Sequence, residues 1–533
     1  MKALFWVSPV TELNLPLQKK AWVTAFVPRV LAALRESQGE VEATIAVSED
    51  VALWIERESV AIQGRVVALA QRELLDGYRV NALLMMKDLQ RGVFRNDDIT
   101  PLLSHVRMRL GGDYNPDVIV AFGPSAYLRK LYPGAQLFHH EYSVFSRAPY
   151  PETWTFDPVG VGYRFSLASE AATINAIPTL EEERCALADY RSSVREALAA
   201  NRYVTEYFCD LRKRYDRILL VPLGYESHYE TLLTLPHQGQ FEVVEQILDS
   251  VSEKTCVIVT QHPARPAVLA EGLDELRGRH PNLEFQEWYL GVPGFSQIAL
   301  VYVDVCACLN TSLAYQAAFL NCRLVSLDGF CAGIADATEF EALESVCSAT
   351  PMNRDGFILW SLKHYAISAP DMARQLACYF QKDIGCLQDS GRFVAEVPEI
   401  LCEGDLLRRL SEWKSLARDF GAELSQVGAP VSQRERMRRH VEDLEIEREA
   451  LFADRDRIVA DRDRLVVECD RIVADRDRIV ADRDRLVVEC DRIIADCARL
   501  TEERDRLLRR YRIPQRLIGL LSHFLRWAKG FAE

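Results

Sequence analysis

Two polar segments of this sequence hold residue types that bind anions. Residues 260–266 include His262 and Arg265, and both side chains can donate hydrogen bonds to a phosphate. Residues 310–312 place two hydroxyls where a helical pattern begins, and the N-terminus of a helix attracts negative charge. Each segment alone is more simply a solvated loop or an ordinary helix cap. Together they predict a pocket for a nucleotide phosphate, bound by His262, Arg265, Asn310, Thr311 and Ser312.

Three carboxylates follow predicted strands and are candidates for catalysis. Glu141 and Asp157 belong to a polar stretch, residues 139–160, that we expect to form a loop, and Glu226 follows a turn after residues 221–224. A carboxylate in a cleft can act as a general base or as a nucleophile, although most loop acids do neither. The neighbouring His139 and His140 invite a metal interpretation. We expect no metal site, because no further ligands stand at suitable spacing.

Alternating strand and helix patterns predict the elements that would position these residues. In the first half, we expect buried strands at residues 3–7, 43–47, 118–122 and 136–138, with helices at 18–36 and 99–110. In the second half, we expect strands at 218–222, 256–260, 283–286, 303–309 and 324–327, with helices at 241–251, 267–279, 312–320 and 405–420. This alternation predicts an α/β fold of two Rossmann-like domains, residues 1–210 and 211–420, with a ligand cleft at the carboxyl ends of their strands.

The composition of the chain argues against some classes of protein. The net charge of −14 argues against nucleic acid as a partner, because phosphate contacts need a basic face. The 14 cysteines are scattered, and Cys256, Cys306 and Cys308 stand in apolar runs, as expected for core residues of a cytoplasmic protein. No run of apolar residues reaches the length that spans a bilayer, so we expect any membrane contact to be peripheral.

The last fifth of the chain has a different pattern. After a predicted linker at residues 421–432, Leu or Ile recurs every seven residues from Leu444 to Leu507, and the stretch from Asp454 is repeated almost unchanged from Asp475. A sustained seven-residue period predicts a coiled-coil stalk at residues 433–510 and hence a homo-oligomer, either a dimer or a trimer. The alternative is a single solvated helix with Asp–Arg pairs.

The tail, residues 511–533, is predicted to form an amphipathic helix. One face collects apolar residues that include Phe524 and Trp527, and the other face carries Arg512, Arg516, Arg526 and Lys529. Such a helix suits a membrane surface or a groove on an assembly partner. Packing of the tail onto the end of the stalk is the simpler alternative.

Residues 1–420 resemble the GT-B glycosyltransferases of bacterial capsule and O-antigen assembly, notably the retaining Kdo transferases and, more distantly, the polysialyltransferases. The resemblance is carried by His262-Pro263, by the run from Thr311 to Phe319 followed by residues 322–325, and by the segments at 139–143 and 156–160. It implies that the His-Pro loop and the Thr-Ser helix start hold a CMP-sugar. It also implies a cytoplasmic enzyme acting on a surface polysaccharide such as capsule or lipopolysaccharide.

The chain departs from that family at three positions. Gln316 stands where the family often has Glu, and Gln261 stands where a basic residue or Pro is common. After residues 221–222 the family usually has an acidic pair, one member of which is the nucleophile of the retaining enzymes, but here only Glu226 is acidic. Glu226 is therefore the candidate nucleophile or second acid, and Glu141 or Asp157 would act on the acceptor hydroxyl.

Three functions remain open from the sequence. The first is a nucleotide-sugar-dependent glycosyltransferase with a CMP-sugar, favoured Kdo, as donor and no further cofactor. The second is a scaffold or length-control protein whose duplicated stalk sets a distance between head and tail. The third is a non-sugar enzyme on the same fold, such as a nucleotide-sugar epimerase-like or polyol-phosphate polymerase-like protein. A simple NAD enzyme is disfavoured, because residues 5–9 replace the glycine-rich turn expected after the first strand.

Overall fold

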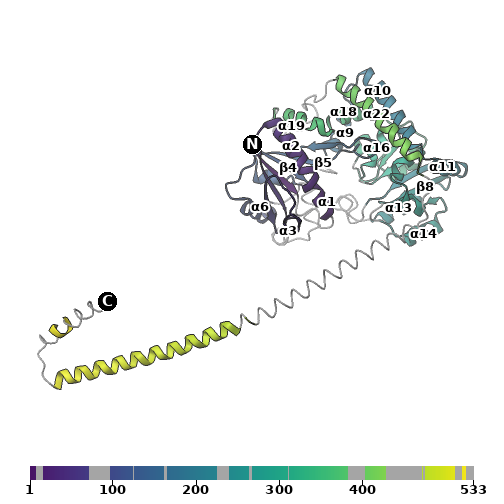
Figure 1. Ribbon diagram of the computed structural model, residues 1–533. Coiled ribbons are helices and arrows are strands. Elements are labelled where there is room, and N and C mark those ends of the chain that lie inside the picture. Colours follow the sequence, from purple (N-terminus) through teal and green to yellow (C-terminus); the bar gives the residue numbers. More distant parts are fainter. Residues whose placement is uncertain are drawn as a thin grey trace. The chain divides into compact units, whose positions relative to one another are not determined.

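The computed structural model describes residues 1–7, 16–70, 96–123, 125–160, 165–224, 239–262, 267–309, 311–329, 331–381, 403–427, 471, 474–510 and 519–523. The chain divides into two compact units, Met1–Gln433 and Arg434–Glu533. The first unit, which we call the head, contains two β-sheets with helices packed around them (Figure 1).

The first sheet has the strand order β3-β2-β1-β4-β5-β6. Its strands are β1 (Lys2–Val7), β2 (Glu42–Ser48), β3 (Arg65–Leu69), β4 (Val118–Phe122), β5 (Gln136–Tyr142) and β6 (Trp154–Asp157). All neighbouring pairs are parallel except β5 and β6. The accompanying helices are α1 (Pro16–Ala21), a π-helical segment η1 (Trp22–Phe26), α2 (Val27–Gln38), α3 (Glu49–Arg57), α6 (Asn96–Leu110) and α7 (Leu128–Leu131).

Both faces of the first sheet are covered. Along β1, Ala3, Phe5 and Val7 belong to the cluster that includes α2, whereas Leu4 and Trp6 belong to a second cluster that includes α6. A strand buried on both faces reads as a continuous apolar run, which explains why the sequence revealed it. The predicted strands at 3–7, 43–47 and 118–122 are confirmed.

The second sheet has the order β11-β10-β7-β8-β9, and all its pairs are parallel. Its strands are β7 (Arg217–Pro222), β8 (Thr255–Thr260), β9 (Leu283–Glu284), β10 (Val305–Cys308) and β11 (Arg323–Ser326). The helices between them are α13 (Gln240–Asp249), α14 (Ala270–Arg279), α15 (Phe295–Ala299) and α16 (Leu313–Phe319). Each predicted strand and helix of this half is present, and Cys256, Cys306 and Cys308 are buried in it as expected.

Five strands of each sheet share one topology. The strand orders are β3-β2-β1-β4-β5 and β9-β8-β7-β10-β11. In each, the first three strands in sequence are added toward one edge of the sheet, and the next two are added toward the other edge. This is the Rossmann order, in which the crevice at the reversal point binds ligands beyond the carboxyl ends of the strands. The prediction of two Rossmann-like α/β halves is confirmed, and the reversal points lie between β1 and β4 and between β7 and β10.

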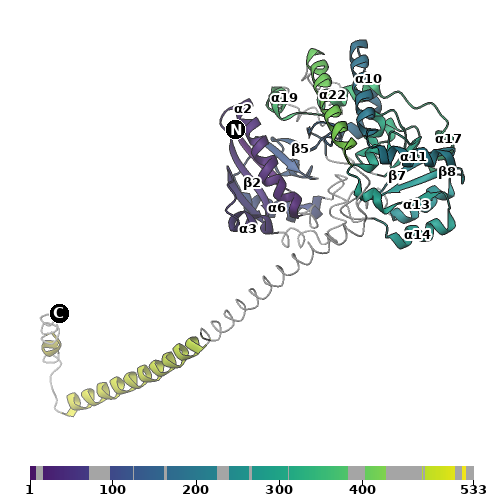
Figure 2. The ribbon, with the colours of Figure 1, turned by 45° about the vertical axis from the view of Figure 1, so that its right-hand side comes forward.

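Helices connect the two halves, and after the second sheet residues 367–381 return to the first sheet (Figure 2). Trp154 in β6 pairs with Ile367, and Tyr379 stacks on Phe138 of β5 at 5.5 Å between ring centroids. The predicted boundary at residues 210 and 211 stays a prediction, but these contacts place residues 367–381 against the first sheet. The connecting helices are α8 (Ser166–Ser169), α9 (Ala171–Asn175), α10 (Glu181–Leu198), α11 (Arg202–Arg214), α17 (Leu343–Val346), α18 (Asp355–His364), α19 (Met372–Gln381) and α22 (Glu403–Ser425).

The predicted linker at residues 421–432 is wrong in its first part, because α22 runs to Ser425. Gly421 lies inside this helix, where a Cβ atom would come within 2.9 Å of Ala197 Cα in α10. The glycine therefore permits close packing of two helices, although its sequence context resembles a flexible linker. Residues 428–432 lie outside the described part of the chain.

In the second unit, residues 474–510 form one α-helix and residues 519–523 are helical as well. The helix 474–510 agrees with the predicted helical stalk, and the coiled coil itself stays a prediction. Most of the predicted tail helix lies outside the described residues. Among the residues that the structure describes, no helix is long and apolar enough to cross a membrane.

Candidate functional site

The carboxyl edge of the second sheet gathers the polar residues predicted to bind a nucleotide. Strands β8 and β10 flank β7 and are parallel to it, so the residues after Thr260 and after Cys308 emerge at one edge. Strands lie about 4.8 Å apart, so these two chain segments start on the order of 10 Å from each other. The reversal point between β7 and β10 falls between them, which makes this edge the candidate nucleotide site.

Gln261 closes the loop that carries His262. Its side-chain Nε2 donates to the backbone oxygen of Val268 at 2.9 Å, and its Oε1 accepts from the Val268 amide at 2.8 Å. Gln261 is buried, whereas His262 is half-buried at the start of the loop. The departure from the family at Gln261 therefore has a structural reason, since this amide joins the two ends of the loop.

The β10–α16 turn presents the second set of polar groups. Thr311 Oγ1 accepts a hydrogen bond from the Leu313 amide at 3.2 Å, so this hydroxyl caps the start of α16. Ser312 is exposed at the same turn, and every residue of α16 is buried. The Ser312 hydroxyl is thus accessible to a ligand, while Thr311 fixes the backbone beside it.

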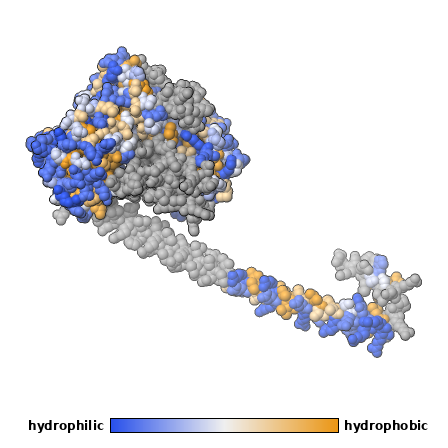
Figure 3. Space-filling model, turned by 180° about the vertical axis from the view of Figure 1, so that it is seen from behind, coloured by the Kyte–Doolittle hydropathy of each residue, from blue (hydrophilic) through white to orange (hydrophobic). Residues whose placement is uncertain are grey.

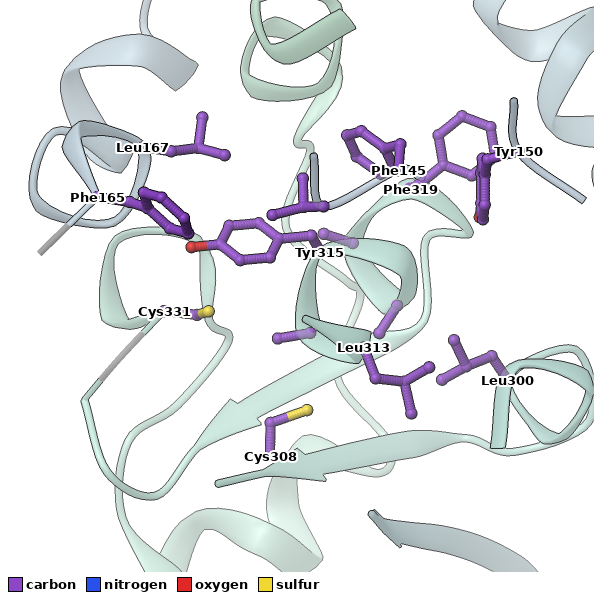
Figure 4. Packing of buried hydrophobic residues seen from close by; sticks show 14 of the residues in the cluster. Phe145, Tyr150, Phe165, Leu167, Leu300, Cys308, Leu313, Tyr315, Phe319 and Cys331 are labelled. Carbon is purple, nitrogen blue, oxygen red and sulfur yellow. The ribbon is translucent and has the colours of Figure 1, made fainter. Parts of the chain in front are cut away.

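Side chains from both halves of the head pack around α16 (Figure 4). Phe145 and Tyr150 contact Phe319 with ring centroids 5.8 and 5.3 Å apart, and Phe165 lies beside Tyr315. Arg191 of α10 donates to the carbonyl oxygen of Phe319 at the other end of the helix. This packing leaves α16 little freedom, so the Thr311–Ser312 turn is held in a fixed position.

Gln316 connects the candidate site to the first half of the chain. Its Oε1 accepts a 2.7 Å hydrogen bond from Gln297 Nε2 in α15, and the same Nε2 lies 3.3 Å from the carbonyl oxygen of Ala148 in the β5–β6 loop. A glutamate at position 316 could accept the same bond. The exchange of Glu for Gln relative to the family therefore removes a charge but keeps the acceptor.

Glu141 and Asp157 lie on one face of the first sheet. In the antiparallel pair β5–β6, His139 is opposite Asp157 and Glu141 is opposite Thr155. Residues in such register share a face, and the two acids are diagonal neighbours across the strand pair. The stretch 139–160 was predicted as a loop. The structure corrects this, since pairing with β6 extends β5 to Tyr142.

The two acids differ in surroundings. Asp157 is fully buried, and its carboxylate accepts hydrogen bonds from the amides of Val159, Gly160 and Ser166 at 2.7, 3.0 and 2.8 Å and from the Ser166 hydroxyl at 3.2 Å. Burial raises the pKa of Asp157 to about 7, although these donors oppose the shift. Glu141 is half-buried at the end of β5. Asp157 thus organises the loop after β6, and Glu141 is the more accessible acid.

The adjacent histidines are enclosed. His140 is stacked on Phe156 at 4.4 Å, its Nδ1 donates to the Thr155 carbonyl at 2.9 Å, and burial lowers its pKa to about 3. The His139 Nδ1 lies 3.3 Å from the Asp157 carbonyl. Among the described residues, no group of three or more His, Cys, Asp or Glu side chains is arranged to hold a metal ion.

Three predicted site residues, Glu226, Arg265 and Asn310, lie outside the described residues. The structure adds residues that sequence reasoning missed. Ser296 Oγ donates to Thr260 Oγ1 at 2.8 Å, which brings α15 to the end of β8, and Gln297 follows it in the same helix. A helix of five residues gives too short a periodic pattern to be recognised in a sequence.

Two Rossmann-like halves define the class of architecture, an α/β fold whose ligand crevices lie at the reversal points of the strand order. No protein-family model matches this chain, and no curated protein matches it in sequence. Among solved structures, it is similar to the β-Kdo 2,7 transferase KpsC of Thermosulfurimonas dismutans, with a TM-score of 0.35 and 11% identity over 70% of this chain and 98% of that one.

Two further solved structures illustrate the range of the similarity. MnaA of S. aureus, solved with UDP, has a TM-score of 0.28 and 11% identity over 75% of this chain and 99% of that one. The UDP-GlcNAc 2-epimerase of Neisseria meningitidis has a TM-score of 0.23 and 11% identity over 78% and 99%. At these values the activity has to be argued from the residues of the site.

Proposed function

We propose that this protein is a glycosyltransferase that takes a sugar from a nucleotide donor, with CMP-Kdo favoured, and adds it to a growing bacterial surface polysaccharide. The single observation that carries the proposal is the convergence of the His262 loop and the Thr311–Ser312 turn at the carboxyl edge of a Rossmann-like sheet. We place the protein in the cytoplasm, with peripheral contact to the membrane through residues 511–533.

In this proposal the donor phosphate lies between the ends of β8 and β10. The His262 ring and the Ser312 hydroxyl donate hydrogen bonds to it, and Arg265 and Asn310 contribute from the same two loops. The two hydrogen bonds between Gln261 and Val268, which we call the clamp, support this assignment, because they fix both ends of the His262 loop before the ligand binds. A preformed site loses less conformational entropy on binding.

Glu141 is the acid that we assign to the acceptor hydroxyl. It is half-buried at the carboxyl edge of β5, whereas the carboxylate of Asp157 is occupied by four hydrogen bonds. A general base needs access to the proton that it removes. Glu226 remains the candidate nucleophile or second acid, on the strength of its place after β7.

Turnover tests the proposal. Purified protein with CMP-Kdo and an oligosaccharide acceptor should release CMP, and Glu141→Gln and Glu226→Gln should each lower kcat by about 100-fold or more, the typical contribution of a general acid or base. Glu152→Gln, an exchange at another acid of the β5–β6 region, is the matched control and should keep turnover within about twofold. Release of CMP that is unchanged in both test variants would refute the catalytic assignment.

A second candidate function is a spacer or length-control protein with a degenerate head. The exposed helix 474–510, with its sequence duplication, favours it. Deletion of residues 475–495 removes three heptads and shortens a continuous helix by about 32 Å. A spacer predicts polymers of altered length with donor turnover intact, whereas polymer length that does not change would exclude the spacer role.

A further inference from the structure

The helix 474–510 exposes an apolar stripe to solvent. Five residues spaced by seven, Ile479, Leu486, Ile493, Leu500 and Leu507, are 69, 62, 56, 61 and 48% exposed. Apolar atoms are visible along this helix between hydrophilic ones (Figure 3). Water contact with such a stripe is unfavourable, and a seven-residue period is the one that keeps an apolar seam facing another helix.

We infer that a second copy of this chain covers the stripe, in parallel and in register. With the five apolar residues at heptad position d, position a is occupied by Arg476, Arg483, Cys490, Cys497 and Arg504. Position g, which borders the seam, is acidic in all five heptads: Asp475, Asp482, Glu489, Asp496 and Glu503. These two positions decide the orientation. The inference does not depend on the proposed enzymatic function.

Charge selects the parallel arrangement. In a parallel pair, the side chain at a lies beside the partner's a and g residues, so Arg476 meets the partner copy's acidic position g. In an antiparallel pair, g faces g, and five acidic residues would oppose five others along the seam. Like charges at short distance repel, whereas the parallel pairing neutralises each arginine.

The same arginines favour a coiled coil of two helices over one of three. In the single helix, Arg476 and Arg483 are 68 and 67% exposed and pair with the next residue, Asp477 or Asp484, at 2.7 Å. At position a of a two-stranded coiled coil, a long side chain still extends its charged end to the solvated rim. A third strand would enclose the guanidinium groups, and burial of charge is costly.

Light scattering on the full chain tests the inference. We expect a mass twice the 60.6 kDa of one chain. The double variant Leu486→Asp/Ile493→Asp should shift the protein to the monomer mass, because it places four carboxylates in the seam. Val488→Asp is the matched control, since Val488 is 69% exposed but lies outside positions a, d, e and g, and it should stay dimeric. A monomeric wild type, a trimer, or a double variant that stays dimeric would overturn the inference.

Cysteine cross-linking tests orientation and register. Cys490 and Cys497 are exposed and occupy position a in successive heptads. In the parallel pair each faces its own copy, so Cys490→Ser and Cys497→Ser should both still be cross-linked by a short bis-maleimide above the level of the double serine variant. In an antiparallel pair, if one cysteine meets its copy, the other two are about 21 Å apart along the axis. Loss of cross-linking in either single variant would overturn the parallel assignment.

Discussion

At the residue scale, the structure gives different surroundings to two acids that the sequence did not distinguish. Glu141 and Asp157 both looked like cleft carboxylates, yet Asp157 is fully buried and accepts four hydrogen bonds. A sequence does not show which carboxylate a folded loop will enclose, because that depends on amides brought together by the turn. The surrounding donors assign Asp157 to the shape of the loop.

The raised pKa of Asp157 predicts a dependence of stability on pH. Its folded-state pKa of about 7 exceeds the ordinary value of 3.8, so the carboxyl group stabilises the fold below about pH 4 and loses that contribution as the pH rises through 7. Asp157→Asn cannot ionise. Relative to the variant, wild type should therefore lose a few kcal/mol of unfolding free energy between pH 4 and 7.

Urea unfolding of both proteins at pH 5, 6, 7 and 8 measures this difference. Taking the difference between the two proteins removes the contributions of His140 and His364, whose lowered pKa values of about 3 make the fold less stable as the pH falls below 6.5. A difference between wild type and variant that does not change with pH would contradict the assignment.

Gln261 gives a second prediction at this scale. Gln261→Ala removes both hydrogen bonds to Val268 and leaves a buried amide and carbonyl unpaired, which costs about 1–3 kcal/mol of unfolding free energy. Because the His262 loop then loses its clamp, nucleotide affinity should fall as well. Gln286→Ala, at a half-buried amide beside β9, should change stability by less than about 0.5 kcal/mol. Equal effects of the two variants would argue against the clamp.

At the element scale, strands with an apolar run were predictable, whereas two strands of the first sheet with weak patterns were not. Strand β4 was predicted at the residues that form it, because Val118–Phe122 is apolar on both faces. Strand β3 was missed, since Arg65–Leu69 is a partly exposed edge strand with a weak pattern. Strand β6 was assigned to a loop, because its four residues are held by pairing with β5 and not by a pattern of their own.

Close packing of α22 on α10 gives a prediction for two glycines. Gly421→Ala would bring a Cβ within 2.9 Å of Ala197 Cα and should cost about 1–3 kcal/mol of unfolding free energy. Gly278→Ala in α14 meets nothing within 4 Å and should stabilise the protein by roughly 0.5–1 kcal/mol, because alanine favours helix. Thermal unfolding distinguishes the two. A Gly421→Ala variant as stable as wild type would mean that the helices are not in close contact.

At the scale of the whole molecule, two kinds of sequence pattern specify two kinds of structure. Alternating strand and helix patterns produced the two Rossmann-like halves of the head, and the seven-residue repeat produced the helix 474–510. The sequence did not reveal that residues 367–381 return to the first sheet, because contacts between distant segments leave no local pattern. That return joins the two halves of the head, between which an acceptor and a donor would have to meet.

In the proposed function, the carboxyl edge of the second sheet binds a nucleotide. Calorimetric titration of the full chain with CMP measures this binding. We predict that wild type binds CMP and that His262→Ala and Ser312→Ala each weaken binding about tenfold or more, equivalent to about 1.4 kcal/mol. His280 lies just before β9, at the amino end of that strand, and His280→Ala should bind CMP like wild type. Absence of CMP binding by wild type, or equal affinity in all three variants, would contradict the claim.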